Sequence, residues 1–230
     1  MGYSEVKSSD LFGELDPLVG KHVPSTLWLR GHQSLLTDTG MVSIVGSREC
    51  SEDGVRRAKK LARILAEHGI TVVSGLAKGI DTAAHTGAIE AGGSTIAVIG
   101  TPIDRAYPAE NAALQEQIAI DHLLVSQFAP GRRVHPSNFP ARNRTMAFIA
   151  HATVIIEAKD QSGTLHQGWE ALRLSRPLFI AESAAQHPDA RWVSEFVKYG
   201  AVLLSADTLD QLLEVVPSSS SSELSGAVPF

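Results

Sequence analysis

The chain has little cysteine, few aromatic residues and no long apolar run, and each shortage excludes a class of protein. Cys50 is the only cysteine among 230 residues, so an intrachain disulfide and a cysteine-based metal site are both excluded. No apolar run reaches the roughly 18 residues that cross a bilayer, and residues 1–10 lack the apolar core of a signal peptide. The sequence therefore predicts a cytoplasmic protein without a membrane partner.

Aromatic residues make up 6% of the chain, whereas hydrophobic residues make up 43%. The core must therefore consist mainly of Ala, Val, Ile and Leu, which suits a sheet covered by helices on both faces. The formal net charge of −5 argues mildly against a dedicated nucleic-acid coat protein, but binding depends on the local potential. One segment is locally basic, because residues 122–156 contain no acidic residue and four arginines: Arg132, Arg133, Arg142 and Arg144.

Short β-branched runs alternate with helical patterns along most of the chain. Buried strands are expected at Val42–Val45, Ile70–Val73, Thr95–Ile99, Leu123–Val125, Val154–Ile156, Leu178–Ile180 and Val202–Leu204, with an additional edge strand at Thr26–Leu29. Helices are expected at Glu52–His68, Ile80–Ala91, Ala109–Ile120, Pro140–Ala150, Leu165–Leu174 and Ala190–Tyr199. This alternation predicts right-handed crossovers and a mostly parallel sheet.

We therefore predict one Rossmann-like α/β domain over residues 11–216, with helices on both faces of the sheet. Residues 1–10 are expected to be a flexible N-terminus. Residues 217–230 are expected to be a disordered serine-rich tail, because five serines follow Pro217. A sheet of this kind binds its ligand beyond the carboxyl ends of its strands, where helix N-termini present free N–H groups.

Glycines, serines and basic residues follow the first two central strands. In Gly46-Ser47-Arg48, the glycine allows close backbone approach, the serine offers a hydroxyl, and the arginine offers a planar fork for phosphate. A tight turn with a capping serine is the alternative. The next strand leads into Ser74-Gly75-Leu76-Ala77-Lys78-Gly79, which has the physical logic of a phosphate-cradling loop without the Gly-Lys-Ser/Thr ending of a nucleoside triphosphatase.

Three titratable residues near these loops suit structural roles better than chemical ones. Asp81 at a helix start is expected to cap the helix or complement its dipole. His85, one turn later, fits a packed histidine better than a catalyst, and Asp104 fits a turn. No cysteine or paired histidine motif lies nearby, so no metal site is predicted.

The most informative segment runs from Pro130 to Arg144. Phe139 lies among arginines and outside any apolar period, an arrangement that suits a stacked base beside phosphate contacts. Alternatively, Phe139 packs against the helix that follows, and the arginines cover a helix end. After the next strand, Ser162-Gly163-Thr164 opens a helix whose N-terminus is suited to a phosphate.

Five runs occur in a fixed order: GSR, SGLAKGIDTAAH, GTPIDRAYPAEN, FPARNR and EAKDQSGTL. Together they closely resemble the DNA-processing protein A family, also called Smf, from about Leu15 to Arg176. The resemblance implies an extended Rossmann fold that binds single-stranded DNA as a homodimer and has no enzymatic activity or cofactor. It also implies a role in natural transformation, in which the protein helps to load a RecA-type recombinase.

Carried onto this sequence, the resemblance assigns phosphate contacts to arginines and a lysine, and base stacking to Phe139. The full predicted DNA- or phosphate-binding set is Gly46, Ser47, Arg48, Ser74, Gly75, Lys78, Gly79, Phe139, Arg142, Asn143, Arg144, Ser162, Gly163 and Thr164. Recognition through backbone contacts and stacking predicts little sequence specificity and a steep salt dependence.

The chain departs from the family pattern in several places. Ser126-Gln127-Phe128 stands where the family often has Ser-Glu before its Pro-Gly. Thr145-Met146-Ala147-Phe148 follows FPARNR where the family usually has Ile-Ile-Ala-Gly. Beyond Arg176, a helix with Trp192 and Tyr199 stands in place of a Pro-Gly turn and a long loop. These departures affect the expected dimer and recombinase contact more than the groove.

Two other functions are left open by the sequence. The fold is also similar to the LOG family of nucleoside-monophosphate phosphoribohydrolases, and Ser162-Gly163-Thr164 overlays its Gly-Thr. Gln167, however, occupies the position of the catalytic glutamate, and an amide is no general base, so only Glu170 could substitute. The third possibility is a sensor that binds a small nucleotide and signals through a partner.

Overall fold

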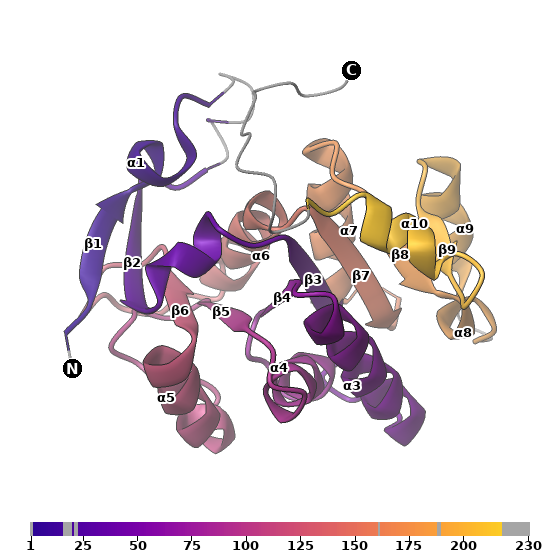
Figure 1. The fold of residues 1–230 in the computed structure, drawn as a ribbon, viewed down its shortest axis with the longest axis horizontal. Coiled ribbons are helices and arrows are strands. Elements are labelled where there is room, and N and C mark those ends of the chain that lie inside the picture. The colour runs from indigo at the N-terminus through magenta and orange to yellow at the C-terminus, as the bar shows by residue number, and fades with distance from the viewer. Residues whose placement is uncertain (1, 16–19, 21–22, 161, 188–189, 218–230) are drawn as a thin grey trace.

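The described residues of the computed structural model (2–15, 20, 23–160, 162–187 and 190–217) contain one nine-stranded sheet in the order β1-β2-β6-β5-β4-β3-β7-β8-β9 (Figure 1). The seven strands from β6 to β9 in this order are parallel, and β2 and β1 continue the sheet in antiparallel pairing. The strands are β1 (Ser4–Lys7), β2 (Thr26–Gly31), β3 (Met41–Gly46), β4 (Thr71–Ser74), β5 (Thr95–Ile99), β6 (Leu123–Ser126), β7 (Ala152–Glu157), β8 (Leu178–Ala181) and β9 (Val202–Leu204). The predicted fold class is confirmed.

The N-terminal residues differ from expectation. Residues 1–10 were expected to be flexible, yet β1 and the start of α1 (Ser8–Phe12) lie there, which makes β1 the edge strand and places β2 inside the sheet. In β1 the side chains alternate between half-buried and exposed, and Val6 packs against the core. Four alternating residues are too short a pattern to recognise in a sequence. The serine-rich tail from residue 218 onward lies outside the described residues.

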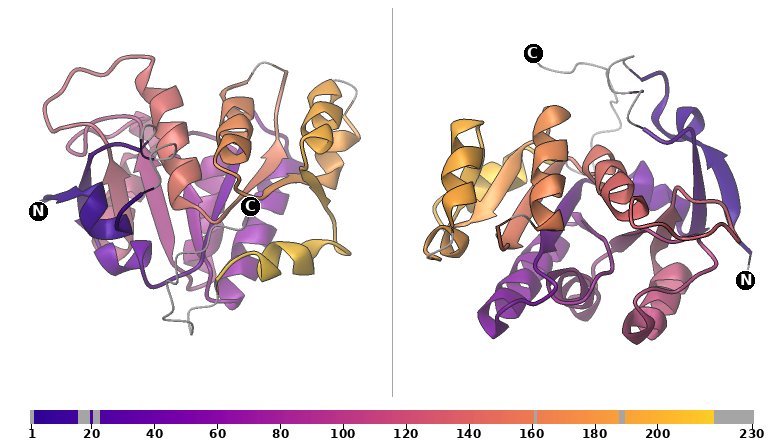
Figure 2. Two further views of the ribbon diagram at one scale, coloured as in Figure 1. Left: turned by 90° about the horizontal axis from the view of Figure 1, so that it is seen from above. Right: turned by 180° about the vertical axis from the view of Figure 1, so that it is seen from behind.

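Helices cover both faces of the sheet, as Figures 1 and 2 show. One face carries α3 (Glu52–Glu67), α4 (Ile80–Glu90), α5 (Ala112–Asp121) and α10 (Leu209–Glu214). The other carries α1, α6 (Asn138–Ile149), α7 (Gly163–Arg173) and α9 (Arg191–Lys198). Short helical segments complete the described residues: η1 (Gln33–Leu36), η2 (Ala109–Asn111) and α8 (Glu182–Ala185).

The central strands are buried on both faces because their apolar side chains alternate between the two helical layers. In β3, Val42 and Ile44 pack under α3 and α4, whereas Met41 and Val45 pack under the opposite layer. This explains why the strands appear in the sequence as continuous apolar runs. No helix among the described residues is long and apolar enough to span a membrane.

Strand order reverses at β3. The chain first builds β4, β5 and β6 on one side of β3, and later places β7, β8 and β9 on the other side. The loops that leave β3 and β7 therefore diverge and open a crevice between them. Open parallel sheets bind ligands at such a switch point, beyond the carboxyl ends of the strands.

Candidate nucleic-acid interface

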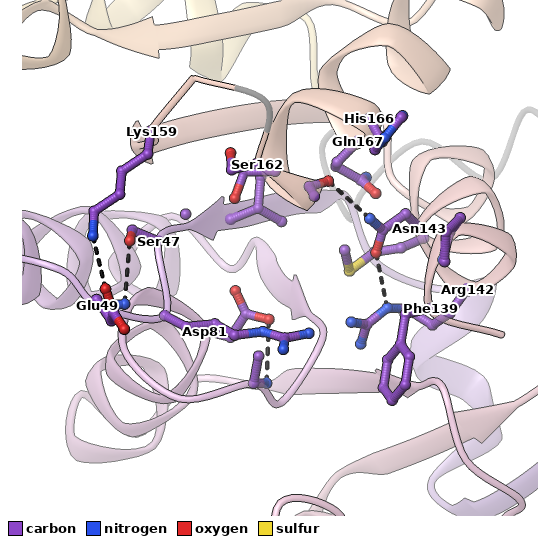
Figure 3. Close-up of a pocket in the computed structure, with 18 residues that line it drawn as sticks. Ser47, Glu49, Asp81, Phe139, Arg142, Asn143, Lys159, Ser162, His166 and Gln167 are labelled. Carbon is purple, nitrogen blue, oxygen red and sulfur yellow. Dashed lines mark hydrogen bonds and ion pairs between the residues drawn. The ribbon is translucent and has the colours of Figure 1, made fainter. Parts of the chain in front are cut away.

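A pocket of about 430 Å³ lies at this switch point (Figure 3). Its walls are the loops after β3 and β7, the start of α4, one side of α6 and the N-terminus of α7. The lining residues are Val45, Gly46, Ser47, Arg48, Glu49, Ala77, Asp81, Phe139, Pro140, Arg142, Asn143, Met146, Lys159, Ser162, Gly163, Thr164, His166 and Gln167. We call it the switch-point pocket.

A smaller cavity of about 80 Å³ adjoins it and shares Arg48, Ala77, Phe139 and Arg142 as a common wall. Its remaining lining comes from the loops after β4 and β5: Gly75, Lys78, Gly100, Tyr107 and Pro108. We call it the side pocket. The two cavities form a groove across the carboxyl ends of β7, β3, β4 and β5, and this groove collects most of the residues predicted from the sequence.

Arg48, Tyr107 and Phe139 form a cluster at the junction of the two pockets, here called the rim cluster. The guanidinium carbon of Arg48 lies 5.8 Å from the centroid of the Phe139 ring, close enough for a cation–π contact. The Tyr107 ring lies 5.6 Å away at 50° to it, and 48% of Tyr107 is exposed. Gly100 leaves room for Phe139, because a Cβ there would lie 2.7 Å from its ring.

The loop from Gly75 to Gly79 is fixed against the β3 loop by its backbone. Gly79 has φ +78°, and a Cβ there would overlap the Ser47 carbonyl oxygen. Ile80 N donates to that same oxygen at 3.2 Å. The buried Asn111 amide donates to Leu76 O at 2.9 Å, which ties the loop to η2. The backbone of Lys78 is therefore held in place while its side chain reaches solvent.

Arg142 lines both pockets, but its guanidinium is hydrogen-bonded to backbone inside the protein. It is 5% exposed, and Nη1 donates to the carbonyl oxygens of Gly75 and, at 2.7 Å, of Val98. The guanidinium thus joins the ends of β4 and β5, and a Cβ at Gly75 would overlap it. Arg142, which the sequence predicted as a phosphate contact, therefore holds loop backbone in place.

Asp81 accompanies Arg142 beneath the groove and is also 5% exposed. Burial raises the pKa of its carboxyl, and the Arg142 charge and a hydrogen bond from Ala77 N, at 3.3 Å, oppose that rise. Burial in turn lowers the pKa of Arg142, which the Asp81 carboxylate opposes. Asp81 lies in the first turn of α4, where the helix dipole favours a carboxylate, but it makes no capping hydrogen bond to the helix and instead holds the loop that precedes α4.

Ser47 and Ser74 also use their hydroxyls inside the protein. Ser74 Oγ donates to Ile44 O at 2.6 Å, and both atoms are buried. Ser47 is 7% exposed, and its Oγ accepts from Glu49 N at 3.2 Å. The serine-capped turn that the sequence left open is therefore present.

The exposed cations of the groove differ in how they are paired. Lys78 Nζ lies 2.5 Å from Glu110 Oε1, and Lys159 Nζ lies 2.7 Å from Glu49 Oε2. Arg48, Arg132 and Arg133 are exposed and form no ion pair with an acidic side chain of the described residues.

Arg144, predicted to contact DNA, and Asp104, predicted to serve in a turn, both lie outside the two pockets. Arg144 Nε lies 3.2 Å from Glu170 Oε2, and Arg144 lines neither pocket. Asp104 Oδ2 accepts from Gly131 N at 3.0 Å and so holds the loop that carries Arg132 and Arg133. The turn role expected for Asp104 is confirmed.

The N-terminus of α7 closes one end of the switch-point pocket. Ser162 precedes α7, and its Oγ is buried without a hydrogen-bond partner in the described part of the chain. Asn143 Nδ2 donates to Gly163 O at 3.1 Å, which ties α6 to α7. Ser162, Gly163 and Thr164 all line the pocket, as predicted from the sequence. Free N–H groups of such a helix end suit a phosphate oxygen.

A family model described as DNA recombination-mediator protein A matches residues 10–217. The chain belongs to this family. Among curated relatives, the DNA processing protein DprA of Streptococcus pneumoniae is 44% identical over 183 residues, covering 80% of this chain and 64% of that protein. Protein Smf of Synechocystis sp. is 37% identical over 177 residues, covering 76% of this chain and 44% of that protein. The chain therefore spans less than two thirds of these two relatives.

Solved structures of DprA proteins are similar over nearly the whole chain. DprA of Streptococcus pneumoniae superposes with a TM-score of 0.79 at 34% identity, covering 91% of this chain and 74% of the other. DprA of Helicobacter pylori, described for its single-stranded DNA binding mode, superposes with a TM-score of 0.77 at 26% identity, covering 92% and 96%. The molybdenum cofactor carrier protein of Chlamydomonas reinhardtii, at 19% identity and a TM-score of 0.52, shares the fold alone.

Within this DprA/Smf fold, Gln167 is occupied by contacts inside the protein. It is 1% exposed, and its amide is best oriented to donate to Asn143 O at 2.6 Å and to accept from Ala147 N at 3.2 Å. An ionised glutamate has no proton to donate to that carbonyl. Glu170, the other carboxyl considered for hydrolysis, pairs with Arg144 and Arg173 and does not line the pocket.

His85 is a neutral residue of the core. It is fully buried, and Nδ1 lies 2.7 Å from Thr95 Oγ1, which itself donates to Val72 O. Burial lowers the pKa of His85 to about 3. The expectation of a packed histidine is confirmed. No group of three or more potential metal-ligating side chains occurs among the described residues.

Sequence reasoning missed three residues of the DprA/Smf groove, Glu49, Tyr107 and Lys159, and also Glu110, which pairs with the groove residue Lys78. Tyr107 was assigned to turn chemistry, although its position before a proline in a strand-end loop marked it as surface-exposed. Lys159 lies inside the run EAKDQSGTL that the resemblance already used. Glu49 and Glu110 gave no signal, because only the fold brings each glutamate to its lysine across 110 and 32 positions of the chain.

Proposed function

We propose that this chain binds single-stranded DNA along the groove, with unpaired bases at the rim cluster and phosphates on the exposed cations. The observation that carries the proposal is the contact of Arg48 with Phe139 beside Tyr107, at the junction of both pockets. An arginine and aromatic rings in one exposed cluster offer a base two kinds of surface for stacking.

The phosphate contacts follow from exposure. Arg48 and Lys78 lie on the groove, and Arg132 and Arg133 extend the positive surface through the loop between β6 and α6, which projects at one corner of the molecule (Figure 2, left). Contacts from these groups to phosphates carry no sequence information, and stacking at the rim cluster tolerates any base. Binding is therefore expected to be independent of sequence and strongly dependent on salt.

The test is a titration of the protein with labelled oligo-dT strands of increasing length, a duplex of the same length, and mononucleotides, at two salt concentrations. Affinity that grows with strand length and falls steeply with salt supports the proposal. Equal affinity for duplex and single strands would contradict it, because a duplex keeps its bases stacked and out of reach of the rim cluster.

The wider role follows from family membership. We infer a cytoplasmic, non-enzymatic homodimer that acts in natural transformation and recombination by delivering single-stranded DNA to a RecA-type recombinase. The internal contacts of Gln167 support the absence of hydrolysis. Analytical ultracentrifugation tests the dimer. Recombinase filament assembly on strands precoated with a single-strand binding protein, with and without this chain, tests the delivery.

A small-nucleotide sensor is the second candidate. The observation that favours it is the switch-point pocket, whose volume of about 430 Å³ ends at the α7 N-terminus and the unpartnered Ser162 hydroxyl. A nucleotide sensor would bind a mononucleotide and a long strand with similar affinity, so the same length series separates the two functions.

A further inference from the structure

We propose that Glu49 and Glu110 are built-in competitors of the DNA phosphates. In the free protein, each carboxylate pairs with a lysine of the groove. When a strand binds, a phosphate replaces the carboxylate, so the two glutamates lower the affinity for DNA and favour its release. This inference rests on the proposed function, and it adds two residues that oppose binding to a site otherwise described by those that favour it.

The two ion pairs are built alike. Lys78 follows β4 and meets Glu110 of η2, which follows β5, with Nζ and Oε1 2.5 Å apart. Glu49 follows β3 and meets Lys159, which follows β7, with Nζ and Oε2 2.7 Å apart. Each pair thus bridges the loops of neighbouring strands, and Figure 3 shows the second one at the edge of the switch-point pocket.

Both pairs lie where a phosphate can replace the carboxylate. The side chains of Lys78 and Glu110 are 56% and 62% exposed, and those of Lys159 and Glu49 are 66% and 84% exposed. The lysine hydrogen bond lowers the pKa of each glutamate, so both carboxylates are charged at neutral pH. An exposed ion pair contributes little to stability, and a nearby phosphate therefore displaces it at small cost.

The unpaired cations make binding possible despite this competition. Arg48, Arg132 and Arg133 have no acidic partner among the described residues, so they are available for the first phosphates of an arriving strand. Once the strand is tethered, its other phosphates reach a high local concentration at the two lysines. A protein that passes its strand to another protein benefits when its own carboxylates compete with the DNA phosphates for the lysines, because this competition favours release of the strand.

The experiment measures binding of a 20-nucleotide oligo-dT by fluorescence anisotropy for the wild type and for Glu49→Gln and Glu110→Gln. Each substitution removes one competitor, and we expect affinity to rise about twofold to fivefold, the range that exposed ion pairs permit. The double substitution is expected to multiply the two gains, because the pairs share no residue.

Glu90→Gln is the matched control. Glu90 pairs with Lys59 at 2.8 Å, with side chains 53% and 40% exposed, and it lies at the far end of α4 from the groove. Eleven helical residues separate the two ends by about 16 Å, beyond the screening length of about 8 Å at physiological salt. An equal gain in Glu90→Gln would reduce the effect to net charge and overturn the proposal.

Placing Glu110→Gln in a Lys78→Ala background separates competition for the lysine from simple repulsion of DNA. Competition predicts no gain from the glutamate substitution once the lysine is absent, whereas repulsion predicts the full gain.

Carboxyl NMR titration of Glu49 and Glu110 adds a direct readout, since both pKa values should rise toward the ordinary value when DNA is added. If the wild type binds DNA and the glutamate variants bind it with the same affinity, the competitor role is refuted and the proposed function stands. A wild type that fails to bind removes the proposed function as well.

Discussion

The polar residues at the carboxyl edge of the sheet fall into two layers that the sequence does not distinguish. The inner layer, formed by Ser74, Asp81 and Arg142, is at most 5% exposed and holds loop backbone in place. The outer layer, formed by Arg48 and Lys78, faces solvent and is free or weakly paired. The comparison teaches that the same kinds of residue serve as scaffold or as contact surface according to their depth.

The strongest test of this division is Arg142→Ala. It removes the guanidinium charge that offsets the buried Asp81 carboxyl and leaves two carbonyl oxygens without their donor, and an uncompensated buried charge of this kind costs about 3–5 kcal/mol. We expect a large fall in the urea midpoint of unfolding, whereas Arg48→Ala in the outer layer should change stability by less than about 0.5 kcal/mol. Similar midpoints for the two variants would remove the distinction.

Acid should destabilise the fold through histidines that burial keeps neutral, chiefly the fully buried His85 and the half-buried His151. Burial lowers the pKa of His85 to about 3 and of His151 to about 4, whereas an unfolded histidine titrates near 6.5. The unfolded state therefore binds more protons below pH 6.5, and the free energy of unfolding falls by up to about 1.4 kcal/mol per pH unit for each histidine. The loss ends near pH 3 to 4, where the folded protein takes up the protons too.

Urea unfolding at pH 7, 6 and 5 measures this slope. His85→Gln should flatten it by removing one contributing histidine, while His151 and His122, whose pKa burial also lowers, remain. His135→Gln, at an exposed position, is the control. A wild-type stability that is constant from pH 7 to pH 5 would mean that these histidines are not buried as described.

Base stacking at the rim cluster should make the largest single contribution to DNA binding. Phe139→Ala is expected to weaken binding of oligo-dT by about 1–3 kcal/mol, the usual contribution of one aromatic stacking partner. Tyr107→Ala, in the same cluster, should have a smaller effect of the same sign. Unchanged affinity in Phe139→Ala would mean that the Phe139 ring only packs against Gly100 and contacts no base.

Lys78→Ala should have the smallest effect, because Glu110 already occupies the lysine. We expect a loss of about twofold to fivefold in affinity and a decrease of about 0.7 in the slope of log affinity against log salt for a single strand. Arg144→Ala, which breaks a pair with Glu170 outside both pockets, should change neither. A larger effect for Arg144 than for Lys78 would place the DNA path over α6 and α7 instead of over the loop from Gly75 to Gly79.

The elements of the fold could be predicted well where burial is two-sided. The buried strand at Thr95–Ile99 has the predicted bounds, because an apolar run between polar turns marks a buried parallel strand clearly. The strand at Val202–Leu204 also has the predicted bounds, although it is half-buried and lies at the edge of the sheet. Helix α6 begins at Asn138, two residues before the predicted start, so Phe139 lies inside its first turn. The edge strand β1 is too short and too polar to give a periodic signal.

The location of the candidate site could also be predicted, because strand ends of a parallel sheet share one edge. The depth of each residue could not. Arg142 and Arg144 differ by two positions on one helix, and this offset of about 200° directs one toward Asp81 and the other toward Glu170. Only the rotation of α6 on the sheet decides between them, and that rotation depends on packing by residues throughout the domain.

The reversal of strand order at β3 also determines when the groove can exist. One wall comes from the loop at Ser47, and the opposite wall comes from Ser162, more than a hundred positions later in the chain. A ribosome must complete β7 and α7 before the two walls can meet, and a polypeptide interrupted after β6 has only one of them. Recovery of DNA binding during refolding should therefore trail the appearance of helical structure.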